Sequence, residues 1–97
     1  MSAQIAGDGG RLRLSGPITL ATAAGLGRAA EAHLVGGEVV VDLSAVTEVD
    51  SSALSLLFEW QRAAKRRNCK ISFSNLPASL VSLADLYGVT DLIPAGV

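Results

Sequence analysis

Three consecutive β-branched residues, Val39 to Val41, constrain the fold of this chain more than any other feature. Such a run is typical of a central strand whose two faces are both covered. Apolar residues at helical spacing precede and follow it, over residues 22–35 and 51–67. Strands joined through helices are linked by crossover connections, so the sequence predicts an α/β fold.

The remaining elements follow from alternation and from turn residues. Gly16 and Pro17 bend or break the first strand, Thr22 is the expected cap of the first helix, and Gly36 and Gly37 are its expected end. The expected order is a polar start at 1–10 that ends in a turn, a strand at 11–15 that residues 18–20 extend, a helix at 22–35, a strand at 38–43, a loop at 44–49, a helix at 51–67, a strand at 70–74, a helix from Pro77 to Gly88 and an extended tail at 89–94.

The length of 97 residues predicts a single domain, residues 1–97, with a modest core. Apolar residues nevertheless make up 49% of the chain, and charged residues only 18%, which is below the usual quarter. Either the core is very efficient or some apolar surface is left for a partner.

Charge and side-chain inventory exclude several classes of function. The net charge of −1 argues against a nucleic-acid binder, and the cluster Lys65-Arg66-Arg67 is expected to be a solvated helix end. Cys69 and His33 are each the only residue of their type, so no metal site and no cofactor are expected. A triad through His33 would lack a nucleophile elbow, and we expect no enzyme activity.

No stretch approaches the roughly 18 consecutive apolar residues of a membrane span, and the first residues do not resemble a signal peptide. We therefore expect a cytoplasmic protein without direct membrane insertion.

Two acids and two hydroxyls stand near the start of the second predicted helix. Asp42 ends the central strand, and Asp50, Ser51 and Ser52 precede the helix. One interpretation is a capping group, because Asp and Ser are preferred caps. The other is a docking or phosphorylation site, since a phosphate on Ser51 or Ser52 would lie at the positive end of the helix dipole.

The second predicted helix carries more apolar residues than a surface helix normally buries. One stripe holds Leu54, Leu57, Phe58 and Ala64, and an adjacent stripe holds Ala53, Leu56, Trp60 and Ala63. Trp60 either completes the core or, with Ala53 and Leu56, faces a partner.

The strand and helix start resemble the signature of the STAS domain family (sulfate transporter and anti-sigma factor antagonist). Asp42-Leu43-Ser44 and Asp50-Ser51-Ser52-Ala53-Leu54 match its two motifs at the right separation, with Ala53 where the family has glycine. The resemblance implies the STAS fold, a mixed β-sheet with helices packed mainly on one face.

Two branches of the family are compatible with the sequence. One contains small subunits of phospholipid-transport ABC complexes that maintain lipid asymmetry of the outer membrane. Ser51 and the segment Leu83–Tyr87 match this branch. It implies a non-catalytic subunit on the cytoplasmic side of the inner membrane that binds and supports the ATP-binding-cassette ATPase. The alternative is an anti-anti-sigma factor, in which Ser52 is phosphorylated by a kinase that is also the anti-sigma factor.

We accordingly expect a partner-binding site at Ser51, Ser52, Ala53, Leu56 and Trp60. Ser52 and Ser51 are the candidate phosphorylation sites, and Asp42 and Asp50 are the supporting acids.

Overall fold

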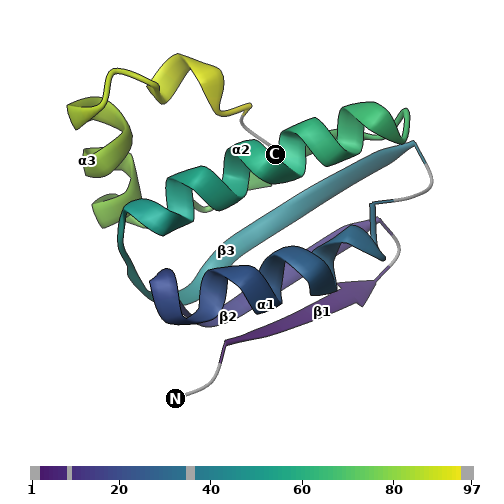
Figure 1. Cartoon of the computed structure of the whole chain (residues 1–97), viewed down its shortest axis with the longest axis horizontal. Coiled ribbons are helices and arrows are strands. Elements are labelled where there is room, and N and C mark those ends of the chain that lie inside the picture. The colour runs from purple at the N-terminus through teal and green to yellow at the C-terminus, as the bar shows by residue number, and fades with distance from the viewer. Residues whose placement is uncertain (1–2, 9, 35–36, 95–97) are drawn as a thin grey trace.

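The computed structural model describes residues 3–8, 10–34 and 37–94 and shows a four-stranded sheet with helices on one face (Figure 1). In chain order the elements are β1 (Gln4–Asp8), β2 (Arg11–Ile18), α1 (Leu20–Glu31), β3 (Glu38–Val49), α2 (Ser51–Arg66), β4 (Lys70–Ser74), α3 (Ala78–Leu86) and the 3-10 helix η1 (Thr90–Leu92).

The sheet has the order β1-β2-β3-β4 and is mixed. β1 and β2 form an antiparallel hairpin, whereas β2, β3 and β4 are parallel neighbours linked through α1 and α2. The predicted α/β fold with a mixed sheet is therefore confirmed. β1 was not expected, because Gln4–Asp8 is short and only the turn that follows it has a clear sequence pattern.

Helices α1 and α2 lie side by side across one face of the sheet, and α3 stands beside the N-terminal end of α2 (Figure 1). Buried and more exposed residues alternate along β2, the first half of β3 and the start of β4. The buried ones are Leu12, Leu14 and Ile18 in β2, Val39, Val41 and Leu43 in β3, and Ile71 and Phe73 in β4.

The opposite face of the sheet carries polar residues, including Arg11 and Arg13, which are exposed, and Asp42. Val40 lies on this face and is only half-buried. The prediction that Val39–Val41 form a strand covered on both faces was therefore wrong. Because two crossover helices pack on the same face, the other face of the described sheet has no helix over it.

Residues 44–49 continue strand β3 and do not form the predicted loop. They pair with the second half of β2, where Ser15 lies opposite Ala45 and Ile18 opposite Val49. Gly16 adopts φ 84° and the register shifts between it and Pro17, so this dipeptide bends β2 without ending it. The extra pairing carries β3 directly to the start of α2.

The helix ends differ from the predictions in detail. α1 begins at Leu20, and Thr22 lies in its first turn, where its Oγ1 accepts the N–H of Thr19 at 3.0 Å. The cap position therefore belongs to Thr19. α1 ends at Glu31, Gly37 lies beyond it, and Gly36 lies outside the described residues.

At the other end of the chain, Pro77 is the N-cap of α3, as predicted to within one residue. The tail expected to be extended contains η1 instead, and the Thr90 hydroxyl donates to Asp85 Oδ1 at 2.9 Å.

Candidate functional site

The carboxylate of Asp50 joins the N-termini of two helices. Its Oδ1 accepts the backbone N–H of Ser52 at 2.8 Å and caps α2, and its Oδ2 accepts the backbone N–H of Leu20 at 3.0 Å in the first turn of α1. Helix N-termini expose N–H groups that no intrahelical carbonyl satisfies. One side chain therefore satisfies donors from both helices and fixes where α2 begins.

These hydrogen bonds favour the ionised form of Asp50. The N–H of Leu20 makes the largest contribution, and it holds the pKa of the carboxyl below its ordinary value although desolvation acts in the opposite direction. The N–H of Ser52 acts in the same direction. Asp50 is therefore a fixed negative charge beside the two hydroxyls.

Ser51 and Ser52 face different sides of α2. Ser52 is half-buried and lines the groove between α1 and α2, while Ser51 is exposed and lines a hollow between α2 and α3 with Phe58 and Tyr87. A change at Ser51 therefore acts on the α3 side, and a change at Ser52 acts on the α1 side.

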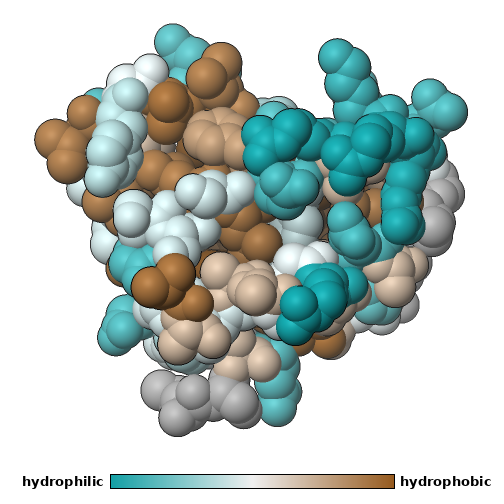
Figure 2. All heavy atoms as spheres, in the orientation of Figure 1, coloured by the Kyte–Doolittle hydropathy of each residue, from teal (hydrophilic) through white to brown (hydrophobic). Residues whose placement is uncertain are grey.

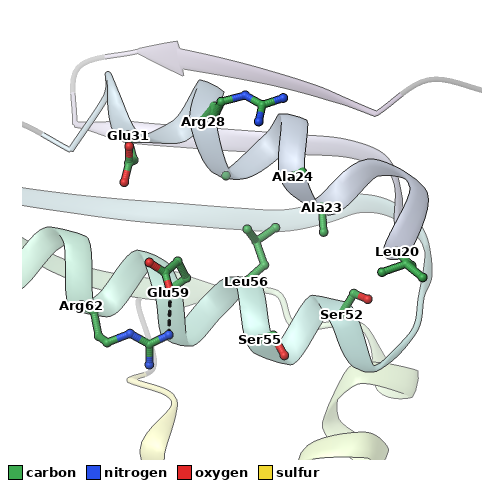
Figure 3. Close-up of a pocket in the computed structure, with 11 residues that line it drawn as sticks. Leu20, Ala23, Ala24, Arg28, Glu31, Ser52, Ser55, Leu56, Glu59 and Arg62 are labelled. Carbon is green, nitrogen blue, oxygen red and sulfur yellow. Dashed lines mark hydrogen bonds and ion pairs between the residues drawn. The ribbon is translucent and has the colours of Figure 1, made fainter.

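The groove between α1 and α2 has a volume of about 610 Å³. Small side chains make its walls, and Leu56 points into it from α2 (Figure 3). Leu20 lies at the end near Ser52, and at the other end Arg62 donates to Glu59 at 2.6 Å (Figure 3). Its wall residues include Ala23, Ala24 and Gly27 from α1 and Ser52 and Ser55 from α2.

Ala53, Leu56 and Trp60 belong to the core of the domain. Their exposed fractions are 0%, 6% and 1%. This corrects the expectation that these three side chains present an open docking face. The apolar arc of α2 is wide because the helix packs at once against α1, α3 and the sheet at β4. Leu56 alone reaches the groove.

The large apolar side chains that are exposed lie elsewhere. Figure 2 shows hydrophobic surface over α3 and η1. Leu86 is 76% exposed and Tyr87 58% exposed at the end of α3, and Leu20 is 81% exposed at the start of α1. Leu20 was missed in the sequence analysis because it was placed in the extended segment before the helix. Leu20 is instead the first residue of α1, and it lines the same groove as Ser52.

Asp42 lies apart from Asp50. Because residues 44–49 are strand, the eight steps of β3 between the two acids span roughly 25 Å. Asp42 Oδ1 accepts the Asn75 amide at 3.0 Å and the Ser44 N–H at 2.9 Å, and these bonds lower its pKa to about 2. Arg11 adds an ion pair at 3.7 Å. The expected gathering of both acids at the helix start is therefore wrong.

The single histidine and cysteine are structural neighbours of the sheet. His33 packs over Gly7 of β1, and Cys69 is buried, which raises the pKa of its thiol. In the described part of the chain, no three metal-binding side chains gather, and no helix is both long and apolar enough to cross a bilayer.

Comparisons with known proteins identify the family and the fold of this chain. A family profile described as "Mlab, STAS domain" matches residues 1–94. No curated protein matches the sequence at a significant level.

Solved structures that share the fold at low identity include the following three. The unphosphorylated anti-sigma factor antagonist SpoIIAA superposes with a TM-score of 0.75 at 11% identity, over 99% of this chain and 89% of that one. An anti-sigma factor antagonist from Mycobacterium paratuberculosis gives 0.72 at 22% identity, over 97% and 83%. An anti-sigma-factor antagonist (STAS) domain protein from Planctomyces limnophilus gives 0.73 at 14% identity, over 98% of this chain and 89% of that one.

The family profile spans nearly the whole sequence. The segment Asp42-Leu43-Ser44 lies in β3, and the segment Asp50-Ser51-Ser52 begins α2. The chain therefore belongs to the STAS domain family.

Proposed function

We propose that this protein is the non-catalytic STAS subunit of a phospholipid-transport ABC complex. It binds the cytoplasmic ATPase subunit through the N-terminal end of α2 and resides on the cytoplasmic side of the inner membrane through that partner. The observation that carries the proposal is the match of residues 1–94 to the family described as MlaB, in a chain whose Ser51 is exposed at the first position of α2.

The surroundings of Ser51 and Ser52 support a docking role. Ser51 and Ser52 are the first two residues of the 16-residue helix α2, and Asp50 caps this helix through the Ser52 N–H. Exposed apolar side chains flank this end, with Leu20 on one side and Tyr87 on the other. Exposed aromatic and aliphatic side chains that gather in one region of a surface are typical of protein–protein contacts.

Copurification with the ATPase subunit tests the proposal. We expect Ser51→Glu and Ser52→Glu to weaken the complex by at least tenfold, because each places a charge in a contact that excludes water. The matched control is Ser79→Glu, because Ser79 occupies the second position of α3 as Ser52 does in α2, and Ser79 lines neither of the two grooves beside the serines. Unchanged copurification of all three variants would contradict the proposal.

A second candidate function has its own support. Two of the solved structures named above are anti-sigma factor antagonists, and Ser52 stands at the second hydroxyl of the motif Asp50-Ser51-Ser52. In this alternative, a kinase that is also an anti-sigma factor phosphorylates Ser52 and binds the unphosphorylated protein. Half-burial of Ser52 in the groove would then require the kinase to reach between α1 and α2.

Intact mass spectrometry separates the two functions. After incubation with ATP and lysate of the source cells, one stable phosphate per chain that Ser52→Ala abolishes favours the anti-anti-sigma role. Unmodified protein that copurifies with the ATPase favours the transporter role.

A further inference from the structure

Strand β1 lies at one edge of the sheet, and its outer side is open. It pairs with β2, and no helix or strand of the described residues lies on its other side (Figure 1). In an antiparallel pair, every second residue directs its N–H and C=O away from the neighbouring strand. Such a row of unpaired backbone groups is a template for a further strand, and native proteins usually protect it.

The two edges of this sheet are protected to different extents. At the β4 edge, the Phe73 N–H donates to the carbonyl of Pro94 at 2.9 Å, and Lys70 adds a charge. In β1, the segment Gln4–Gly7 has no charged residue and no proline, and its register against β2 is free of bulges. Charges, prolines, bulges and covering segments are the features that keep strand edges apart. This segment of β1 has none of them.

A hollow accompanies the open edge. It lies between β1 and α1 and has a volume of about 310 Å³. Its lining is uncharged and consists of Ala3, Ile5, Ala21, Thr22, Gly25, Leu26 and Ala29. Ile5 is only half-buried, although it stands opposite the buried Leu14 on the face of the sheet that the helices cover. The apolar core is therefore incomplete along this side of the domain.

The side of α1 that borders the hollow carries small residues. Ala21, Gly25 and Ala29 are exposed and recur every four residues, so they lie above one another on one side of the helix. A Cβ at Gly25 would meet no atom within 4 Å, so the space beside it is open. A second helix can approach such a surface closely, because the distance between packed helices depends on the side chains at the contact.

We propose that this edge is the interface of a homodimer, in which the β1 strands of two copies pair antiparallel about a two-fold axis. An axis beside Ala6, the middle residue of β1, pairs all five residues of the strand with those of the second copy. The same open edge then satisfies itself, and no charged residue of Gln4–Gly7 is brought against its like.

This pairing closes the core that one copy leaves incomplete. Ile5 lies opposite Gly7 of the second copy and diagonally across from the second Ile5, at roughly 7–8 Å between Cα atoms, near enough for the two side chains to meet. The two α1 helices lie on the same face of the joined sheet with their small residues toward each other. Ser52 lines the groove on the other side of α1, so the dimer leaves the proposed partner contact free.

Sedimentation of the full chain over a range of concentrations tests self-association. We expect the average mass to rise with concentration from that of one chain towards that of two. Ala6→Lys places like charges directly opposite each other on the open sheet face and should weaken the dimer at least tenfold. The matched control Ser72→Lys adds the same charge on the same face at the other edge and should leave association unchanged. A chain that stays monomeric, or equal losses in the two variants, would overturn the proposal.

Disulfide cross-linking tests the register of the pair. Residues at position 6 of the two copies lie about 4.5–5.5 Å apart between Cα atoms, a distance that suits a disulfide, so Ala6→Cys should cross-link on mild oxidation. Gln4→Cys is the control on the same face of the same strand, because its two copies lie roughly 14 Å apart. The parent should not cross-link, since Cys69 is buried. Any other pattern would contradict the proposed pairing.

Gly25→Leu tests the contact between the α1 helices separately from the strands. The new side chain enters open space in a single copy, so the melting temperature of the monomer should stay the same or rise. In the dimer it meets the second α1 and should weaken association at least tenfold. Ala24→Leu makes a similar change one residue away, toward the groove with α2, and is the control. Equal association of Gly25→Leu and Ala24→Leu would show that the helices do not meet and would overturn this arrangement of the dimer.

Discussion

Asp50 and Leu20 are thirty residues apart in sequence, yet the carboxylate of one accepts the backbone N–H of the other at 3.0 Å. The same carboxylate caps α2 through Ser52. The segment that carries the two serines is thus fixed relative to α1 as well as to its own helix. A partner that contacts Ser52 therefore also lies close to the first turn of α1.

Removal of the shared carboxylate should loosen both helix ends. We expect Asp50→Ala to lower the melting temperature by about 5 °C, whereas Asp50→Asn, which keeps one acceptor oxygen, should give an intermediate value. Thermal denaturation followed by circular dichroism measures this. Glu48→Ala, an exposed acid just before it, is the control and should melt like the parent. Equal melting temperatures for Asp50→Ala and Glu48→Ala would show that the shared cap contributes nothing.

Asp42 should make stability depend on acid pH. Its pKa is lowered from 3.8 to about 2, so its contribution is present above about pH 4 and is lost as the pH falls toward 2. In Asp42→Asn this loss should be absent, and the urea midpoint should fall less between pH 4 and pH 2 than in the parent. Chemical denaturation at pH 7, 4 and 2.5 gives the comparison. Parallel pH profiles for parent and variant would rule out Asp42 as the titrating group.

Burial of Trp60 in the core gives a direct test of its role. Trp60→Ala should cost about 3–5 kcal/mol of unfolding free energy, because a large buried side chain is removed. As Trp60 is the only tryptophan, fluorescence of the parent should be blue-shifted and move to the red on unfolding. An unchanged free energy of unfolding in Trp60→Ala would contradict the burial of this side chain in the core.

Gly7 and His33 should show coupled effects. A Cβ at residue 7 would lie 2.6 Å from His33 Nδ1, closer than van der Waals contact allows. We expect Gly7→Ala to destabilise the fold by about 1 kcal/mol and His33→Ala to restore most of that loss. The measurement is a double-mutant cycle of urea denaturation. Additive free energies would mean that His33 moves aside at no cost.

Elements that depend on local sequence patterns could be predicted from the sequence, and elements that depend on contacts between distant segments could not. The strands at β2, β3 and β4 and the span of α2 follow from local spacing, and they were predicted. The second half of β3 was not, because only pairing with β2 across Gly16 and Pro17 makes residues 44–49 a strand.

The candidate site divides in the same way. The cap at Asp50 is local and could be predicted from the motif Asp50-Ser51-Ser52. Trp60 could not be placed, since its burial comes from the simultaneous packing of three neighbours around α2. The contact with Leu20 was equally hidden, because it joins segments that are distant in the chain.

Leu20 should matter for binding and not for folding. Its side chain is 81% exposed, so Leu20→Ala should leave the urea midpoint unchanged. It stands at the end of the groove beside Ser52, where a partner that contacts Ser52 would cover it. Loss of a buried leucine contact at an interface should weaken binding of the ATPase subunit about tenfold. Leu92→Ala on η1 is the control, because Leu92 is 61% exposed but lines neither groove beside the two serines. Titration calorimetry should show a lower affinity for Leu20→Ala and an unchanged affinity for Leu92→Ala if the partner docks on the α1 side. Equal affinities of the two variants would instead indicate that the contact lies on the α3 side.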